Sequence, residues 1–205
     1  MPRATAAAAA QTAHQILDSA TGLFASRGFA EVSLDDVAKD AGVTRGAVYH
    51  HYRNKAGLFR AVAARAQATV ADTVVEAAGR AGTDPGEQLR AGCHAFLDAI
   101  TATPSVRILL VDAPAVVGWQ EWRRLDAENS APHLRDALHD VGVADDLLDA
   151  MTAQLSGAMN EAALWTAQQP DPAAARTQAH AVLDRLLSAV LTQPAPGPGH
   201  GNGNG

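Results

Sequence analysis

Apolar residues recur at helical spacing along nearly the whole chain. Between residues 11 and 27 the larger apolar side chains fall three and four positions apart, and Gly28 follows where a C-terminal cap belongs. The same period returns in most later segments, and no segment shows the strict alternation of a half-buried strand. The pattern therefore predicts an all-α fold.

Capping residues divide the first third of the chain into short helices. Ser33 with Asp36 three residues later forms a capping-box pattern, which predicts a helix over 34–41 that ends at Gly42. Thr44 can cap a helix over 45–50. Asn54 can cap a long fourth helix that runs to the segment GRAGTDPG at 79–86.

Prolines and turn residues mark the later elements. A helix is expected from Pro85 to a stop at Pro104, and the apolar run VRILLVDAPAVV at 106–117 fits a buried strand or a short helix. Its helical neighbours favour a helix. Further helices are expected over 119–142 with a break near Pro132, and over 145–169 and 171–193. No internal repeat is evident. Residues 1–10 and 194–205 are expected to be a disordered arm and tail.

The amino-acid composition indicates in which cellular compartment the protein is expected. The 205 residues are 47% hydrophobic, which is enough to bury a core, and the single cysteine, Cys93, excludes an internal disulfide. The stretch MPRATAAAAAQTAHQ lacks the apolar centre of a signal peptide, and no run approaches the roughly 18 apolar residues of a membrane span. We expect a soluble, cytoplasmic protein with no membrane partner.

Charge is distributed unevenly. Residues 1–65 hold eight Lys/Arg and five Asp/Glu (+3) and residues 66–205 hold eight and seventeen (−9), which together give the net charge of −6. Within the basic part, the stretch 42–59 carries Arg45, Arg53 and Lys55 and no acid. A basic end on an acidic chain is typical of a protein that meets a polyanion at that end only.

Two short predicted helices joined at residues 41–44 match a helix-turn-helix. Gly42 gives the turn its backbone freedom, and Val43 fills the angle between the helices. In this motif the second helix enters the major groove with its first residues at the base edges. Those residues are Thr44, Arg45, Gly46 and Ala47. The guanidinium of Arg45 can bind guanine O6 and N7.

The segment SLDDVAKDAGVTRGAVYHHYRNKAGLFRAV, with ILDSATGLFASRGF before it, resembles the N-terminal domain of the tetracycline-repressor (TetR) family. The resemblance implies a three-helix DNA-binding head over 11–56, a ligand-binding and dimerisation body over 57–193, and a palindromic operator in double-stranded DNA. It implies base contacts from the four residues above, phosphate contact by Ser33, and backbone contacts from Tyr49, His51 and Lys55. Asp35 and Asp36 depart from the family, where a basic residue is common.

The body carries no motif that identifies its small-molecule ligand. All three tryptophans lie there, and large rings either fill a core or line a pocket. The candidate lining residues are Phe96, Trp119, Trp122, Arg123, Asn160 and Trp165. Small and apolar residues in the last two helices suit a homodimer interface. Its candidates are Leu155, Met159, Leu183, Leu187 and Val190.

These features favour a homodimeric repressor released from its operator by a ligand, and two alternatives stay open. An effector-free regulator or architectural protein would share the head, and a solid body without a cavity would support it. An all-α enzyme is disfavoured, because no catalytic triad motif, metal-protease motif or nucleotide-binding loop occurs. No cofactor is expected. No metal site is expected either, since the adjacent His50 and His51 point in different directions on a helix.

Overall fold

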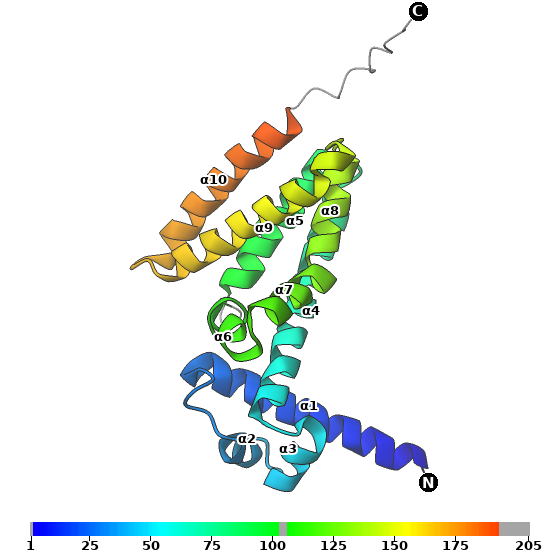
Figure 1. The fold of residues 1–205 in the computed structure, drawn as a ribbon, viewed down its shortest axis with the longest axis vertical. Coiled ribbons are helices and arrows are strands. Elements are labelled where there is room, and N and C mark those ends of the chain that lie inside the picture. The colour runs from blue at the N-terminus through cyan, green and yellow to red at the C-terminus, as the bar shows by residue number, and fades with distance from the viewer. Residues whose placement is uncertain (1, 103–105, 193–205) are drawn as a thin grey trace, which may run out of the picture. The chain divides into compact units, whose positions relative to one another are not determined.

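The computed structural model describes residues 2–102 and 106–192, and every regular element within them is a helix (Figure 1). The elements are α1 (Pro2–Arg27), α2 (Leu34–Asp40), α3 (Arg45–Tyr52), α4 (Lys55–Arg80), α5 (Pro85–Thr101), the π-helical η1 (Val106–Asp112), α6 (Ala113–Val117), α7 (Trp119–Asn129), α8 (Ala131–Asp140), α9 (Asp145–Ala167) and α10 (Pro172–Leu191). The all-α prediction is confirmed.

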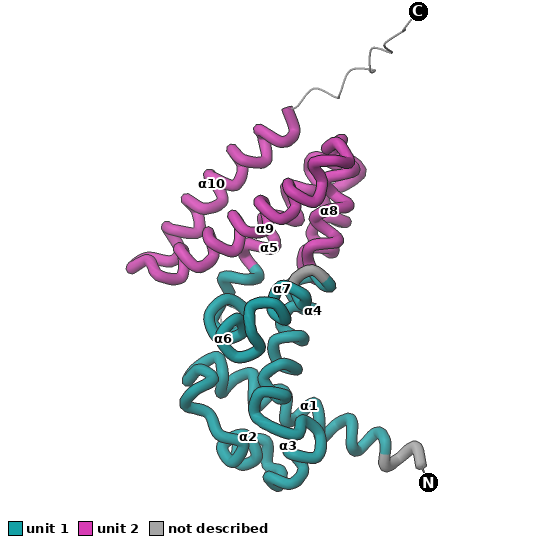
Figure 2. The backbone as a smooth tube through the Cα atoms, in the orientation of Figure 1, with its two compact units in different colours: residues 1–71, 99–129 teal, residues 72–98, 130–205 magenta. Residues whose placement is uncertain are grey.

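The chain folds as two compact units (Figure 2). The first combines Met1–Ala71 with Ala99–Asn129, and the second combines Asp72–Asp98 with Ser130–Gly205. Helices α4 and α5 each contribute residues to both units. This division differs from the sequence-based boundary at residue 56, since α7 and most of α4 group with the helix-turn-helix.

The predicted helix caps of the first unit are present. Ser33 Oγ accepts from the Asp36 amide at 3.1 Å while the Asp36 carboxylate accepts from the Ser33 amide at 2.8 Å, so the capping box is complete. The side chain of Thr44 caps α3, which ends two residues later than predicted. Asn54 Oδ1 accepts from the Gly57 amide at 2.7 Å and caps α4.

Three phenylalanines form the centre of the first unit. The rings of Phe24 and Phe29 each lie edge-on to Phe59, with centroids 5.2 Å apart in both pairs. Val48 of α3 is fully buried and attaches the short helix to this core. A Cβ on Gly57 would overlap the carbonyl oxygen of Tyr52, so the close turn from α3 to α4 requires glycine.

Two segments differ from the expectation. Helix α1 starts at Pro2, whereas a disordered arm was predicted for residues 1–10. Alanine has the highest helix propensity, and the alanine run extends a helix that is anchored further along by buried residues. The predicted helix at 106–117 is confirmed, but its first half is a π-helix, which the periodicity did not indicate. Pro104 and the tail at 194–205 lie outside the described residues.

The second unit contains a short repeat that the sequence reading missed. The segments RAGCHAFLD (90–98) of α5 and RTQAHAVLD (176–184) of α10 share Arg, His, Ala, Leu and Asp at the same spacing. Their polar residues pair across the two helices. Arg90 and His94 donate to Asp184, and His180 donates to Asp98 at 2.8 Å.

Within the described part of the chain, no single helix is both long and apolar enough to cross a membrane. Only the pair of segments Pro85–Thr101 and Val106–Val117 meets the length and composition criteria together, and this pair is sharply bent.

Candidate nucleic-acid interface and cavity

The start of α3 is presented to solvent. Thr44, Arg45 and Gly46 are exposed and Ala47 is half-buried, whereas Val48, the next residue, has no exposed surface. The Thr44 cap fixes the first turn, because its hydroxyl accepts from the Ala47 amide at 3.2 Å. The four residues predicted to read bases therefore lie together on the outer end of one anchored helix.

Arg45 is engaged by an acidic residue of the preceding helix. Its Nη1 donates to Asp35 Oδ2 at 2.9 Å, and the two side chains remain 69% and 62% exposed. Asp36, the other acid that departs from the family pattern, serves the capping box, and the Ser33 hydroxyl lowers its pKa. The two neighbouring acids thus have separate structural roles.

The residues predicted to hold the DNA backbone surround this helix start. Ser33 is exposed at the cap of α2, Tyr49 is 63% exposed, and His51 is half-buried. Lys55 Nζ donates to the carbonyl of Ala30 at 3.0 Å and lies 4.4 Å from the centroid of the Phe29 ring. Since the ammonium has three donors, one such contact leaves others for an anion.

Arg53 is a further basic group of the stretch 42–59, and no specific DNA contact was assigned to it. It follows α3 with φ at +65°, and it is the only non-glycine residue at positive φ among the described residues. Its amide donates to the Tyr49 carbonyl at 2.8 Å and closes the helix. A glycine is the usual residue at such a position, so an exposed arginine here is kept at a cost in backbone strain.

The α1–α2 connection is held by residues from η1, which belongs to the same unit. Arg107 Nη2 donates to the carbonyl of Arg27 at 3.2 Å, and Asp112 Oδ2 accepts from the Phe29 amide at 3.0 Å. Gly28, between them, has φ at +83° and leaves the space that the Arg107 guanidinium occupies. The π-helical segment therefore fixes the end of α1.

The six residues predicted to line a ligand site are divided between the two units. Trp119, Trp122 and Arg123 belong to the first unit, where the buried Trp122 donates its indole N–H to the Leu109 carbonyl at 2.7 Å. Arg123 lies over the ring of the exposed Trp119, 5.9 Å from its centroid. The other three are Phe96, Asn160 and Trp165 of the second unit.

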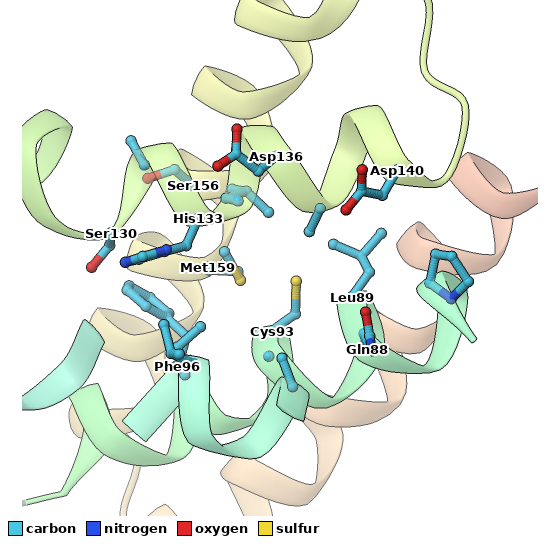
Figure 3. Close-up of a pocket in the computed structure, with 18 residues that line it drawn as sticks. Gln88, Leu89, Cys93, Phe96, Ser130, His133, Asp136, Asp140, Ser156 and Met159 are labelled. Atoms are coloured by element: carbon cyan, nitrogen blue, oxygen red, sulfur yellow. The ribbon is translucent and has the colours of Figure 1, made fainter. Parts of the chain in front are cut away.

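A cavity of about 210 Å³ lies inside the second unit (Figure 3). Leu89, Cys93, Phe96 and Met159 give it apolar walls, and burial raises the pKa of the Cys93 thiol to about 12, so this thiol is neutral at pH 7. Across the cavity α8 contributes His133, Asp136 and Asp140. None of the described lining residues is Lys or Arg.

Sequence reasoning missed the α8 part of this lining. Its residues 133, 136 and 140 are spaced by three and four positions, which places them on one helix face, and that spacing was available as a signal. Of the six predicted lining residues, Phe96 alone lines the 210 Å³ cavity. Of the three tryptophans, Trp122 is buried, Trp119 is exposed in the first unit, and Trp165 is exposed in the second.

The predicted dimer residues are mostly buried inside this chain. Leu155, Met159, Leu183 and Leu187 are at most 6% exposed, so they have almost no surface left for a partner. The large apolar residues that α9 and α10 do expose are Leu147, Trp165, Val182 and Leu186, and the last three line a second cavity, a groove of about 580 Å³. The four buried side chains instead form part of the core of their own unit.

The chain matches known regulatory proteins along most of its length. Residues 16–62 match the model of bacterial regulatory proteins of the tetR family, and residues 86–190, just over half of the chain, match the tetracyclin repressor-like C-terminal domain. It is 35% identical over 112 residues to the transcriptional regulator AcrR of Shigella flexneri, which covers 55% of this chain and 52% of AcrR. Identity to the repressor BepR of Brucella suis is 38% over 76 residues, or 37% and 36% of the two chains.

A solved structure extends the likeness to nearly the whole chain, whereas the matches to these curated relatives span about half of their length or less. It is a tetR-family regulator from Pectobacterium atrosepticum, 32% identical, with a TM-score of 0.73 over 92% of this chain and 98% of that one. The chain therefore belongs to the tetR family of bacterial regulatory proteins, whose members are DNA-binding transcriptional regulators and not enzymes.

Proposed function

We propose that this chain is a homodimeric repressor that binds a palindromic operator through α3 and is released by a small molecule. The observation that carries the proposal is the exposed start of α3, where Arg45 stands on a helix that is capped by Thr44 and anchored by Val48. A helix held in this way can enter the major groove without rearranging its core. A regulator of chromosomal genes would act in the cytoplasm.

Arg45 is the proposed base reader. Its guanidinium can bind guanine O6 and N7, while Gly46 and Ala47 are small enough to allow close approach. Phosphate contacts are proposed for the hydroxyl, imidazole and ammonium donors of Ser33, Tyr49, His51 and Lys55. The Thr44 hydroxyl is proposed to contact a base edge. Lys55 stands in the first turn of α4, where helix amides add a favourable field for an anion.

We infer that two copies associate through the exposed face of α9 and α10. Trp165, Val182 and Leu186 are 39%, 55% and 45% exposed around an apolar groove, and clustered exposure of this kind is uncommon on a monomer. A second copy is the proposed occupant, because a palindromic site needs two heads related by a two-fold axis.

The cavity of the second unit is the proposed ligand site. Its presence favours a ligand-responsive regulator over the effector-free alternative. The volume of about 210 Å³ lies below the roughly 300–1,000 Å³ of drug-sized sites, so a small ligand fits best. Residues of α4 line the cavity at Val74, Val75 and Ala78, and the same helix starts beside the DNA-reading residues at Lys55. If α4 takes one position when the protein binds DNA and another when it does not, a ligand with different affinities for these two states can shift operator affinity.

The test is selection of bound sequences from random duplex DNA with the full chain. We expect a palindromic consensus, and Arg45→Ala should lower operator affinity by about 1–3 kcal/mol and relax preference at one base-pair position in each half-site. Lys55→Ala should weaken binding to all sequences and lower the salt slope by about one. Arg80→Ala, a charge-matched change in the second unit, should do neither. Failure to enrich any sequence would refute the proposal.

A further inference from the structure

The fold places the carboxylate of Asp35 at the N-terminal end of α3, the helix proposed to bind DNA. The stretch 42–59 contains no Asp or Glu, yet Asp35 reaches it from the second position of α2 and binds the first residue of α3. The bond joins Asp35 Oδ2 to Arg45 Nη1 at 2.9 Å. The acid therefore contacts the residue to which base reading is assigned.

Fold stability does not explain this contact. Both side chains are more than three-fifths exposed, and exposed ion pairs add little to stability. The local structural tasks fall to the other acids of α2: Asp36 completes the capping box and Asp40 accepts from the Ser19 hydroxyl at 2.6 Å. Near DNA, moreover, a carboxylate repels phosphate. Asp35 therefore lowers the affinity for DNA unless another contact compensates for this repulsion.

We propose that Asp35 is a specificity-determining residue that acts through Arg45. A guanidinium carries five N–H donors, and the bond to Asp35 engages one at Nη1. The other N–H donors of the guanidinium remain free to bind guanine. Because the bond to Asp35 already restricts the Arg45 side chain, less conformational freedom is lost when the operator binds. On other sequences Arg45 stays paired with Asp35 and is not available to grip phosphate. The inference rests on the proposed function, in which Arg45 reads a base.

The decisive variant is Asp35→Asn, measured against the selected operator and against random duplex DNA in the same salt. Loss of the carboxylate should raise affinity for random DNA and lower the operator-to-random ratio by about three- to fivefold. Asp40→Asn is the matched control, since it removes the same charge from the same helix but contacts Ser19 and not Arg45. That control should leave the ratio unchanged.

A double variant separates action through Arg45 from a general charge effect. In the Arg45→Ala background, Asp35→Asn should leave the operator-to-random ratio unchanged. An unchanged ratio for Asp35→Asn alone, or an equal fall in both backgrounds, would overturn the inference. The proposed function fails separately, if Arg45→Ala by itself retains full preference for the operator. Thermal melting of each variant checks that the head is folded.

Discussion

The imidazole rings of His94 and His180 lie in contact, with their centroids 4.4 Å apart and their planes tilted by 50°. Each ring also binds a carboxylate of the opposite helix through Nε2: His94 binds Asp184 at 2.9 Å and His180 binds Asp98 at 2.8 Å. An ionised carboxylate only accepts, so each imidazole carries a proton on Nε2. The two copies of the short repeat thus pair antiparallel and join α5 to α10.

These contacts between α5 and α10 predict that the folded protein loses stability in acid. Burial alone raises the pKa of Asp184, but hydrogen bonds from Arg90 and His94 outweigh it, so the pKa lies below its usual value. A depressed folded-state pKa contributes stability above the unfolded value of about 3.9, and that contribution is lost as the pH falls through the folded value. Asp184→Asn should cost about 0.5–1 kcal/mol near pH 7 and flatten the stability curve below about pH 4.

Urea unfolding at a series of pH values measures this effect. Asp72→Asn, a change of an exposed acid on α4, is the control and should keep the acid-side slope of the wild type. Parallel pH curves for the wild type and Asp184→Asn would contradict the prediction. The charged groups that face the two histidines are Arg90, Asp98, Arg176 and Asp184.

Local chemistry made much of the fold predictable. A cap needs residues within one turn, so Ser33, Thr44 and Asn54 located three helix starts from the sequence alone. The repeat at His94 and His180 was missed, because its copies are 86 positions apart (180 − 94) and neither is a motif by itself. The π-helix at 106–112 was not predictable either, since its bonds depend on packing and not on local propensity.

The candidate sites were predictable to different degrees. The exposed start of α3 could be predicted from local sequence, because a capped helix after a tight turn buries one face, here at Val48, and leaves its first residues exposed. For α9 and α10 the apolar pattern did not reveal which face is covered. Leu187 and Leu186 are adjacent leucines, yet one is fully buried and the other is 45% exposed, and only the packing of α10 on its neighbours decides between them.

That difference yields a prediction about assembly. If two copies associate as proposed, Val182→Asp and Leu186→Asp should each convert the dimer to a monomer with little effect on the thermal stability of the unit, because both side chains are exposed in the single chain. Sedimentation at micromolar concentration measures this. Leu187→Ala is the contrasting variant: it should cost about 2–5 kcal/mol of stability through the cavity it leaves. A dimer that persists in both charged variants would place the interface elsewhere.

Two glycines should respond to alanine in opposite directions. Gly28→Ala imposes a side chain at φ +83° and displaces the Arg107 guanidinium, so we expect a loss of about 1–2 kcal/mol. Gly157 lies within α9 with no atom near its absent Cβ, so Gly157→Ala should stabilise by up to about 1 kcal/mol. Chemical denaturation compares them. A neutral Gly28→Ala would contradict both the strain expected at φ +83° and the expected cost of displacing Arg107.

Arg53 predicts a conflict between stability and DNA binding. Arg53→Gly should stabilise the head by up to about 1 kcal/mol, because glycine adopts φ +65° without strain. It should also lower affinity for all DNA sequences and reduce the salt slope by about one if the guanidinium meets a phosphate. Arg53→Ala separates the two effects: it loses the charge and keeps the strain. Equal melting temperatures for the glycine and alanine variants would refute the strain argument.

The charge around the cavity narrows the class of ligand. Asp136 and Asp140 of α8 line the cavity together with the apolar Cys93, Phe96 and Met159, and none of the described lining residues is Lys or Arg (Figure 3). A small apolar molecule with one cationic group meets both surfaces. An anion of the same shape would meet two carboxylates without a compensating cation.

Benzylammonium and benzyl alcohol are matched probes for this preference, since they share a ring and differ in charge. The ammonium should raise the melting temperature more than the alcohol, with about a two- to fivefold difference in affinity, because each carboxylate is partly exposed and screened. The double variant Asp136→Asn, Asp140→Asn should bind the two probes with equal affinity. Ala137→Phe, which fills the cavity from α8, should abolish binding of both and leave operator affinity intact. Tighter binding of the alcohol to the unchanged protein would show that the carboxylates do not select the ligand.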